Sequence, residues 1–128
     1  MFAPNVSSIA AATGVNTATW TGPTRTLAYG NADGYASASA VLLWKLTQAG
    51  GVTAPTCTLY IEVSADAVTW YRIPITGAAT DADETLSGVV EIGVMTKYAR
   101  AYAVLGGATP PTCAITVQLA SSAPITVS

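Results

Sequence analysis

The chain has 128 residues, of which 51% are hydrophobic and only 9% are charged, and its formal net charge is −2. This length suits one domain with its own core, and the apolar content excludes a disordered chain. A typical soluble domain is about 25% charged, so the exposed surface must consist mainly of neutral residues. Such a surface fits a protein that packs against neighbours, and it fits equally well an extracellular or simply Thr-rich β protein.

The charge pattern also argues against two classes of partner. The five basic residues are scattered along the chain and form no patch, so we expect no nucleic-acid partner; they are Arg25, Lys45, Arg72, Lys97 and Arg100. The densest apolar run, residues 40–44, is far shorter than the ~20 residues that cross a bilayer, so no membrane partner is expected. The first five residues lack the pattern of a secretory signal, which predicts synthesis in the cytoplasm.

In chain order, the first 16 residues show weak periodicity and are expected to form an extended N-terminal arm. Short runs of β-branched and aromatic residues follow, separated by Gly, Pro, Asn and Asp. They predict strands near 17–20, 24–29, 37–47, 56–63, 69–75, 85–92, 98–105 and 112–120. The expected fold is all-β: an antiparallel β-sandwich over residues 17–128, jelly-roll or Ig-like, with about eight strands. The tail from Ser121 onward is expected to add an edge strand or a second arm.

Alternation assigns the two faces of these strands, because successive side chains of a strand point to opposite sides. The predicted core residues of two strands are Cys57, Leu59, Ile61 and Val63, and Cys113, Ile115, Val117 and Leu119. Tyr60 and Glu62 are expected to face outward. The run 41–44 is apolar on both faces, which predicts a strand that is central in its sheet or covered outside by another chain.

An internal repeat relates residues 50–67 to residues 106–123, with seven of eighteen positions identical. Each copy begins Gly-Gly-x-Thr-x-Pro-Thr-Cys and follows a predicted strand. We interpret each copy as a hairpin with this motif at its tip, and the pair as the product of a duplication. Similar turn chemistry in unrelated segments is the alternative.

Residues that carry chemistry are few. The chain has no His, which removes the usual general base and metal ligand, so we expect no catalytic site, no metal, no cofactor and no enzymatic activity. Asp81, Asp83 and Glu84 lie close together and could bind a cation, although a solvated turn is the simpler interpretation. Cys57 and Cys113 open equivalent strands on core faces, so they are expected to lie near each other as a disulfide or as paired core thiols. Cytoplasmic synthesis favours the free thiols.

The stretch 64–71, Ser-Ala-Asp-Ala-Val-Thr-Trp-Tyr, followed by Arg72-Ile73-Pro74-Ile75, resembles small β-sandwich structural proteins of tailed-phage virions. Asp66 is expected to accept backbone N–H bonds within the turn, and Trp70 to pack on the following strand. The resemblance implies a non-enzymatic virion protein, a capsid cement or decoration protein. It further implies the major capsid protein or other virion proteins as partners, a homo-oligomer that is most often a trimer, and location in the virion.

Two alternatives remain open, a tail or fibre component and a carbohydrate-binding or adhesin module. Aromatic side chains exposed together would form a sugar platform. The residues that we single out as interface candidates are Phe2, Trp20, Tyr29, Tyr35, Tyr60 and Tyr71.

Overall fold

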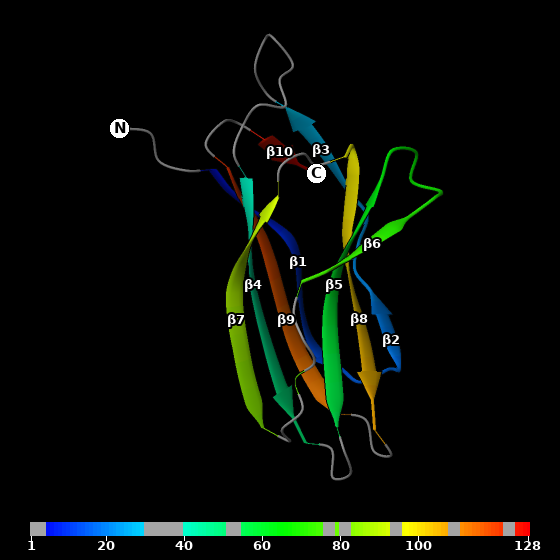
Figure 1. The fold of residues 1–128 in the computed structure, drawn as a ribbon, viewed down its shortest axis with the longest axis vertical. Coiled ribbons are helices and arrows are strands. Elements are labelled where there is room, and N and C mark those ends of the chain that lie inside the picture. The colour runs from blue at the N-terminus through cyan, green and yellow to red at the C-terminus, as the bar shows by residue number, and fades with distance from the viewer. Residues whose placement is uncertain are drawn as a thin grey trace.

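A computed structural model of the chain describes residues 5–29, 40–50, 55–75, 79, 83–92, 96–107, 111–121 and 125–128 (Figure 1). These residues form ten β-strands and no helix. The strands are β1 (Asn5–Val15), β2 (Thr19–Thr21), β3 (Arg25–Tyr29), β4 (Ala40–Ala49), β5 (Thr56–Ser64), β6 (Tyr71–Pro74), β7 (Glu84–Ile92), β8 (Tyr98–Gly106), β9 (Thr112–Ser121) and β10 (Ile125–Val127).

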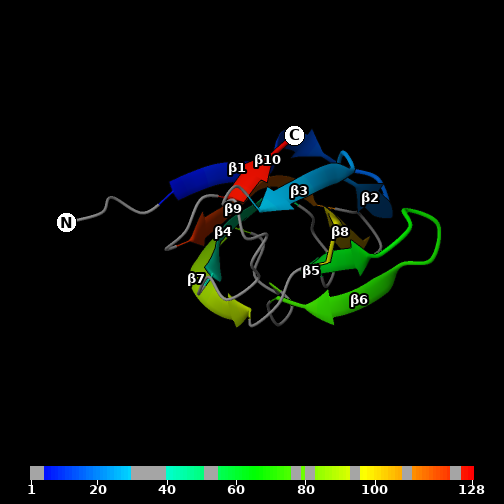
Figure 2. The same ribbon diagram turned by 90° about the horizontal axis from the view of Figure 1, so that it is seen from above.

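The strands form two antiparallel sheets that face each other. The four-stranded sheet has the order β1-β9-β4-β7. The six-stranded sheet has the order β10-β3-β8-β5-β6, and β2 pairs with β8 beside this path. Figure 2 shows the two layers from above, with β1 beside β10 at one side and β7 and β6 at the other. The predicted antiparallel β-sandwich is therefore confirmed.

The chain ends differ from expectation. Residues 5–15 do not form an arm: they are strand β1, which pairs with β9 from Asn5↔Ser121 to Val15↔Cys113. The prediction failed because the register shifts between Ser8 and Ala10 and again after Ala12. A bulge adds an unpaired residue and breaks the two-residue alternation on which strand prediction relies. At the other end β10 pairs with β3, so the expected edge strand is present.

The Gly-Gly-x-Thr-x-Pro segments are not the tips of hairpins. The first leads from β4 in the four-stranded sheet to β5 in the six-stranded sheet, and the second leads from β8 back to β9. Gly50 and Gly107 begin these connections with positive φ values of 74° and 112°, a backbone conformation that glycine adopts at no steric cost. Both segments therefore connect the two sheets, while a duplication stays a prediction.

The core fills the space between the sheets. Leu42 and Leu46 of β4 are fully buried, as are Leu59 and Ile61 of β5. The inward face of β8 carries three fully buried alanines, Ala99, Ala101 and Ala103, which leave room for the larger side chains opposite. The predicted inward faces of 57–63 and 113–119 are confirmed, although Val63 is only partly buried. As predicted, β4 is an interior strand of its sheet.

Candidate interaction surface

The outer face of the four-stranded sheet is a broad neutral surface. Its side chains alternate with core residues along β4, β7 and β9, so they point away from the six-stranded sheet. Three rows of paired residues cross it: Val6, Ala120, Val41 and Glu91; Ser8, Gln118, Leu43 and Val89; Ala11, Thr116, Lys45 and Ser87. We call these twelve residues the neutral face. Lys45 and Glu91 are its only charged members.

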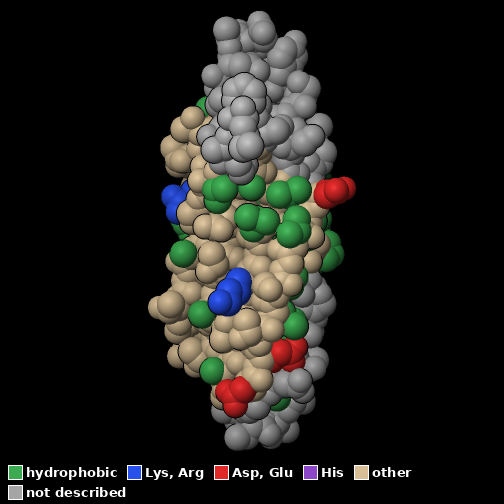
Figure 3. Space-filling view, turned by 90° about the vertical axis from the view of Figure 1, so that its left-hand side faces the viewer, with side chains coloured by type: hydrophobic (Ala, Val, Ile, Leu, Met, Phe, Trp, Pro, Cys, Tyr) green, Lys and Arg blue, Asp and Glu red, His purple; other side chains and the backbone are tan. Residues whose placement is uncertain are grey.

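The neutral face carries an apolar patch on β4 and β7, formed by Val41, Leu43 and Val89. Val89 is 61% exposed, which is high for valine, and Leu43, its cross-strand partner, is half-buried. Val6 on β1 is a further exposed valine, at 50%. Figure 3 looks onto this side and shows hydrophobic side chains gathered in one patch, with the charged groups spaced apart. Exposed apolar groups that are contiguous, unlike single scattered ones, indicate a contact surface.

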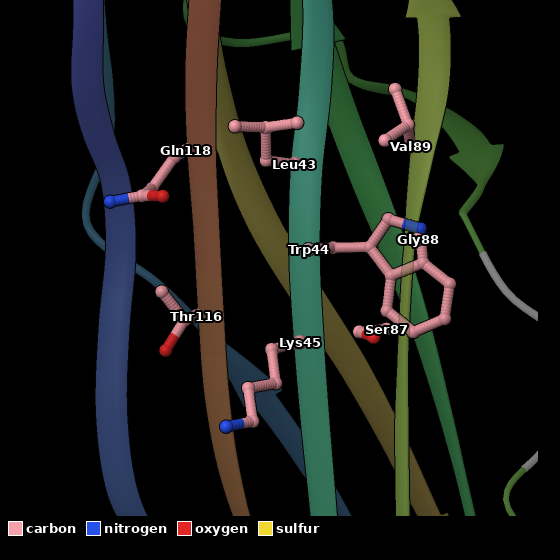
Figure 4. A pocket seen from close by; sticks show the side chains of 8 residues that line it. All are labelled: Leu43, Trp44, Lys45, Ser87, Gly88, Val89, Thr116 and Gln118. Atoms are coloured by element: carbon pink, nitrogen blue, oxygen red, sulfur yellow. The ribbon is translucent and has the colours of Figure 1, made fainter.

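A shallow hollow of about 360 Å³ lies within the neutral face. Its lining is mainly apolar and consists of Leu43, Trp44, Lys45, Ser87, Gly88, Val89, Thr116 and Gln118 (Figure 4). Trp44 pairs with Gly88 across β4 and β7, and its indole lies where a side chain at position 88 would be. A Cβ atom at Gly88 would be 2.9 Å from Cζ2 of that indole. Trp44 also packs against the core, and Gly88 leaves the space that its indole occupies.

The outer face of the six-stranded sheet has the opposite character. Glu62 on β5 pairs in register with Arg72 on β6 and with Arg100 on β8. One carboxylate oxygen of Glu62 accepts from Nε of Arg100 at 2.8 Å, and the other accepts from Nη2 of Arg72 at 3.2 Å. Glu62 is predicted to face outward, and it does so, yet it is only 5% exposed because these partners cover it.

Aromatic rings surround the two guanidinium groups. The Arg72 guanidinium lies 3.9 Å from the ring centre of Tyr102 and 5.3 Å from that of Tyr60. The Arg100 guanidinium lies 3.9 Å from the ring centre of Trp70. We call Tyr60, Glu62, Trp70, Arg72, Arg100 and Tyr102 the arginine–aromatic cluster. Its charges are paired and its rings are already stacked, so it stabilises this face rather than offering free aromatic faces to a sugar.

Of the other predicted interface residues, the structure describes the side chains of Trp20 and Tyr71. Trp20 packs against the core, and Tyr71 is 66% exposed on β6. Tyr29 belongs to β3, but its side chain is not among the described ones. Phe2 and Tyr35 lie outside the described residues. The described candidates therefore lie in separate surroundings.

The turn between β5 and β6 is held by two side chains. Oδ1 of Asp66 accepts from the backbone N–H groups of Val68 and Thr69, both at 2.9 Å, and the Ser64 hydroxyl accepts from the N–H of Ala67. The N–H groups of Thr69 and Val68 lower the pKa of the Asp66 carboxyl, because they favour its charged form. The predicted role of Asp66 is confirmed. Trp70 follows the turn and stacks on Arg100.

Ala67 gives this turn a test of stability. Its φ is +62°, in a region that costs an L-residue with a Cβ about 1–2 kcal/mol. We expect Ala67→Gly to raise the free energy of unfolding by about 0.5 kcal/mol after the entropic cost of glycine is deducted. Ala65→Gly is the matched control, since Ala65 is equally exposed but has no positive φ, and it should lower stability. Urea denaturation measures the free energy of unfolding of the two variants. An equal decrease in both would contradict the prediction.

The two predicted cysteines lie in one core cluster, whereas the acidic residues form no described cluster. Cys57 and Cys113 are fully buried and carry free thiols. Asp81 lies outside the described residues, Asp83 is exposed, and Glu84 begins β7. The described part of the chain contains no group of three acidic, Cys or His residues that could hold a metal ion. It also contains no helix long and apolar enough to cross a membrane.

No protein-family model and no curated protein sequence matches the chain. Among solved structures, the chain is similar to one from infectious bursal disease virus, Gx strain, with a TM-score of 0.51 and 13% identity over 93% of this chain and 32% of that one. For a structure of the Gt strain the TM-score is 0.52 and the identity is 14%, over 97% of this chain and 36% of that one. For a mutant VP2 protein of the same virus, in derived T=1 particles, the TM-score is 0.50 and the identity is 16%, over 92% of this chain and 31% of that one.

What these molecules share is the fold. The similar structures are capsid proteins of an animal virus, not of a tailed phage. The chain spans about a third of their length. The expected likeness to β-sandwich virion proteins is thus confirmed for the architecture, and the likeness to tailed-phage proteins stays a prediction.

Proposed function

We propose that this protein is a non-enzymatic structural component of a virus particle, a cement or decoration protein that binds a capsid shell and stabilises it. The observation that carries the proposal is the neutral face. It presents a continuous sheet surface with an apolar patch formed by Val41, Leu43 and Val89 and with two charged residues, Lys45 and Glu91, among its twelve members.

The composition of the neutral face matches that of protein–protein interfaces. The centre of such an interface is depleted of charged residues, and its rim is polar. Here Ser87, Thr116 and Gln118 border the apolar patch and can exchange hydrogen bonds with a partner. A surface of this kind costs little to desolvate, because few charges lose their water.

The fold supports the same proposal. The solved structures that share this sandwich are viral capsid proteins. We propose the major capsid protein as the partner, the virion as the location, and a homotrimer as the assembly that binds. A tail or fibre component would use the same surface to bind a different partner. Co-sedimentation with shells or with tails distinguishes the two roles.

The test is co-sedimentation of the purified protein with shells assembled from the major capsid protein of the same genome. We expect Val89→Asp to weaken binding at least about tenfold, because it places a charge in the apolar patch. Val68→Asp is the matched control: Val68 is 79% exposed but lies in the turn between β5 and β6 of the six-stranded sheet, so binding should not change. Thermal unfolding of both variants shows that they are folded.

Three outcomes overturn the proposal. A monomer by light scattering that does not sediment with shells removes the structural role. Equal binding by Val89→Asp and by the unmodified chain would show that the contact with shells lies outside the neutral face. Sedimentation with tails in place of shells replaces the cement role with that of a tail component.

A further inference from the structure

Cys57 and Cys113 lie where the two sheets meet at one end of the sandwich. Cys57 is the second residue of β5 in the six-stranded sheet, and Cys113 is the second residue of β9 in the four-stranded sheet. Figure 1 shows both strands beginning at the lower end of the molecule. Each cysteine closely follows one of the two Gly-Gly-x-Thr-x-Pro segments, both of which connect one sheet to the other.

The two thiols lie in the same part of the molecule, the core between the sheets. Both residues are 0% exposed and belong to one core cluster, and each thiol shifts the pKa of the other. They belong to strands of different sheets, so one covalent bond between them would join the layers. The backbone at Cys57 is fixed as well, since its N–H and carbonyl both pair with Ala79, at 3.1 and 2.9 Å.

We propose that Cys57 and Cys113 are an oxidation site whose disulfide locks the two sheets together. A disulfide compound, such as oxidised glutathione, is the oxidant. The thiolate of one cysteine attacks it and releases one glutathione thiolate, and the other cysteine then attacks the mixed disulfide and releases the second. Two cysteine thiols are oxidised, their two protons go to solvent or to the departing thiolates, and one glutathione disulfide is reduced to two glutathione molecules.

The surroundings of the pair make this reaction conditional. Thiol–disulfide exchange needs a thiolate and access for the oxidant. Burial raises the pKa of both thiols and excludes the oxidant, so the folded protein reacts slowly. The bond forms when the sheets separate at this end, either transiently or during folding. A chain that folds reduced can therefore be locked later, in an oxidising environment.

The lock should be strong because the bond would close nearly half the chain into a loop. Restricting a long loop of the unfolded chain stabilises the folded state more than restricting a short one. We expect the oxidised protein to unfold at a temperature roughly 10 °C higher than the reduced protein.

The experiment uses the purified full chain, incubated with oxidised glutathione with and without urea below the unfolding midpoint. Intact mass and thiol labelling under denaturing conditions follow the reaction. We expect an intramolecular disulfide that forms several-fold faster in urea and raises the midpoint of thermal unfolding. Cys113→Ala and Cys57→Ala are the controls, and oxidant should not raise the midpoint of either.

The unmodified chain alone keeps the proposal falsifiable if a variant fails to fold. Stable glutathione adducts without an internal disulfide would overturn it, as would cross-linked dimers. A disulfide that leaves the unfolding midpoint unchanged or lowers it would show that the bond strains the sandwich and does not lock it.

Discussion

Replacing Glu62 with Gln should lower the free energy of unfolding by about 2 kcal/mol. The substitution keeps the size of the side chain but removes the charge that both Arg72 and Arg100 contact. Hydrogen bonds to charged groups contribute about 1.5–3 kcal/mol each. The expected loss is smaller than two such bonds, because the Arg72 side chain is 45% exposed and water can solvate it.

Glu91→Gln is the matched control, since Glu91 is an exposed carboxylate in a strand of the other sheet. It should change stability by less than about 0.5 kcal/mol. Urea denaturation measures both variants. If Glu62→Gln were as stable as the control, the arginine–aromatic cluster would owe its stability to stacking alone.

Gly88→Ala should destabilise the protein by about 1–2 kcal/mol, although alanine usually suits a strand better than glycine does. The new Cβ would lie 2.9–3.1 Å from three atoms of the Trp44 indole. Such overpacking forces the ring to move and typically costs 1–3 kcal/mol. Displacing Trp44 would also reshape the hollow, so binding to shells should weaken too.

A double-mutant cycle with Trp44→Phe isolates this contact. The smaller ring leaves room for the methyl group, so Gly88→Ala should cost less in the Trp44→Phe background than in the unmodified chain. Equal costs in the two backgrounds would mean that the clash is not with Trp44.

The sequence predicted the sandwich well where apolar residues alternate without interruption. Residues 57–61 and 113–119 have core and outer faces as expected, because one side of each strand is buried and this fixes the register. Strand β1 was not predicted, since its bulges and its small side chains conceal the alternation. The Gly-Gly-x-Thr-x-Pro motif correctly indicated where strands end. The same residue types occur in hairpin turns and in connections between sheets, so the motif does not distinguish the two.

The candidate site was harder to predict. The predicted interface candidates were aromatic residues. The neutral face instead consists mainly of Val, Leu, Ser, Thr and Gln from strands that are distant in sequence. One signal was present: the run 41–44 is apolar on both faces, which pointed to an interior strand or an outer partner. The partners of Glu62 are 10 and 38 residues away, a separation that no local pattern reveals.

The strand pairing also constrains how this chain can fold as it is synthesised. Among the described pairs, only β5 and β6 are neighbours in sequence. The turn held by Asp66 is thus the one place where a strand pair can form early, without closing a long loop. Strand β1 pairs with β9, yet β1 ends at Val15 and β9 begins only at Thr112. Strand β1 must therefore wait for the synthesis of β9 before it can pair, and during that time its core residues Ile9 and Val15 are unprotected and can promote aggregation.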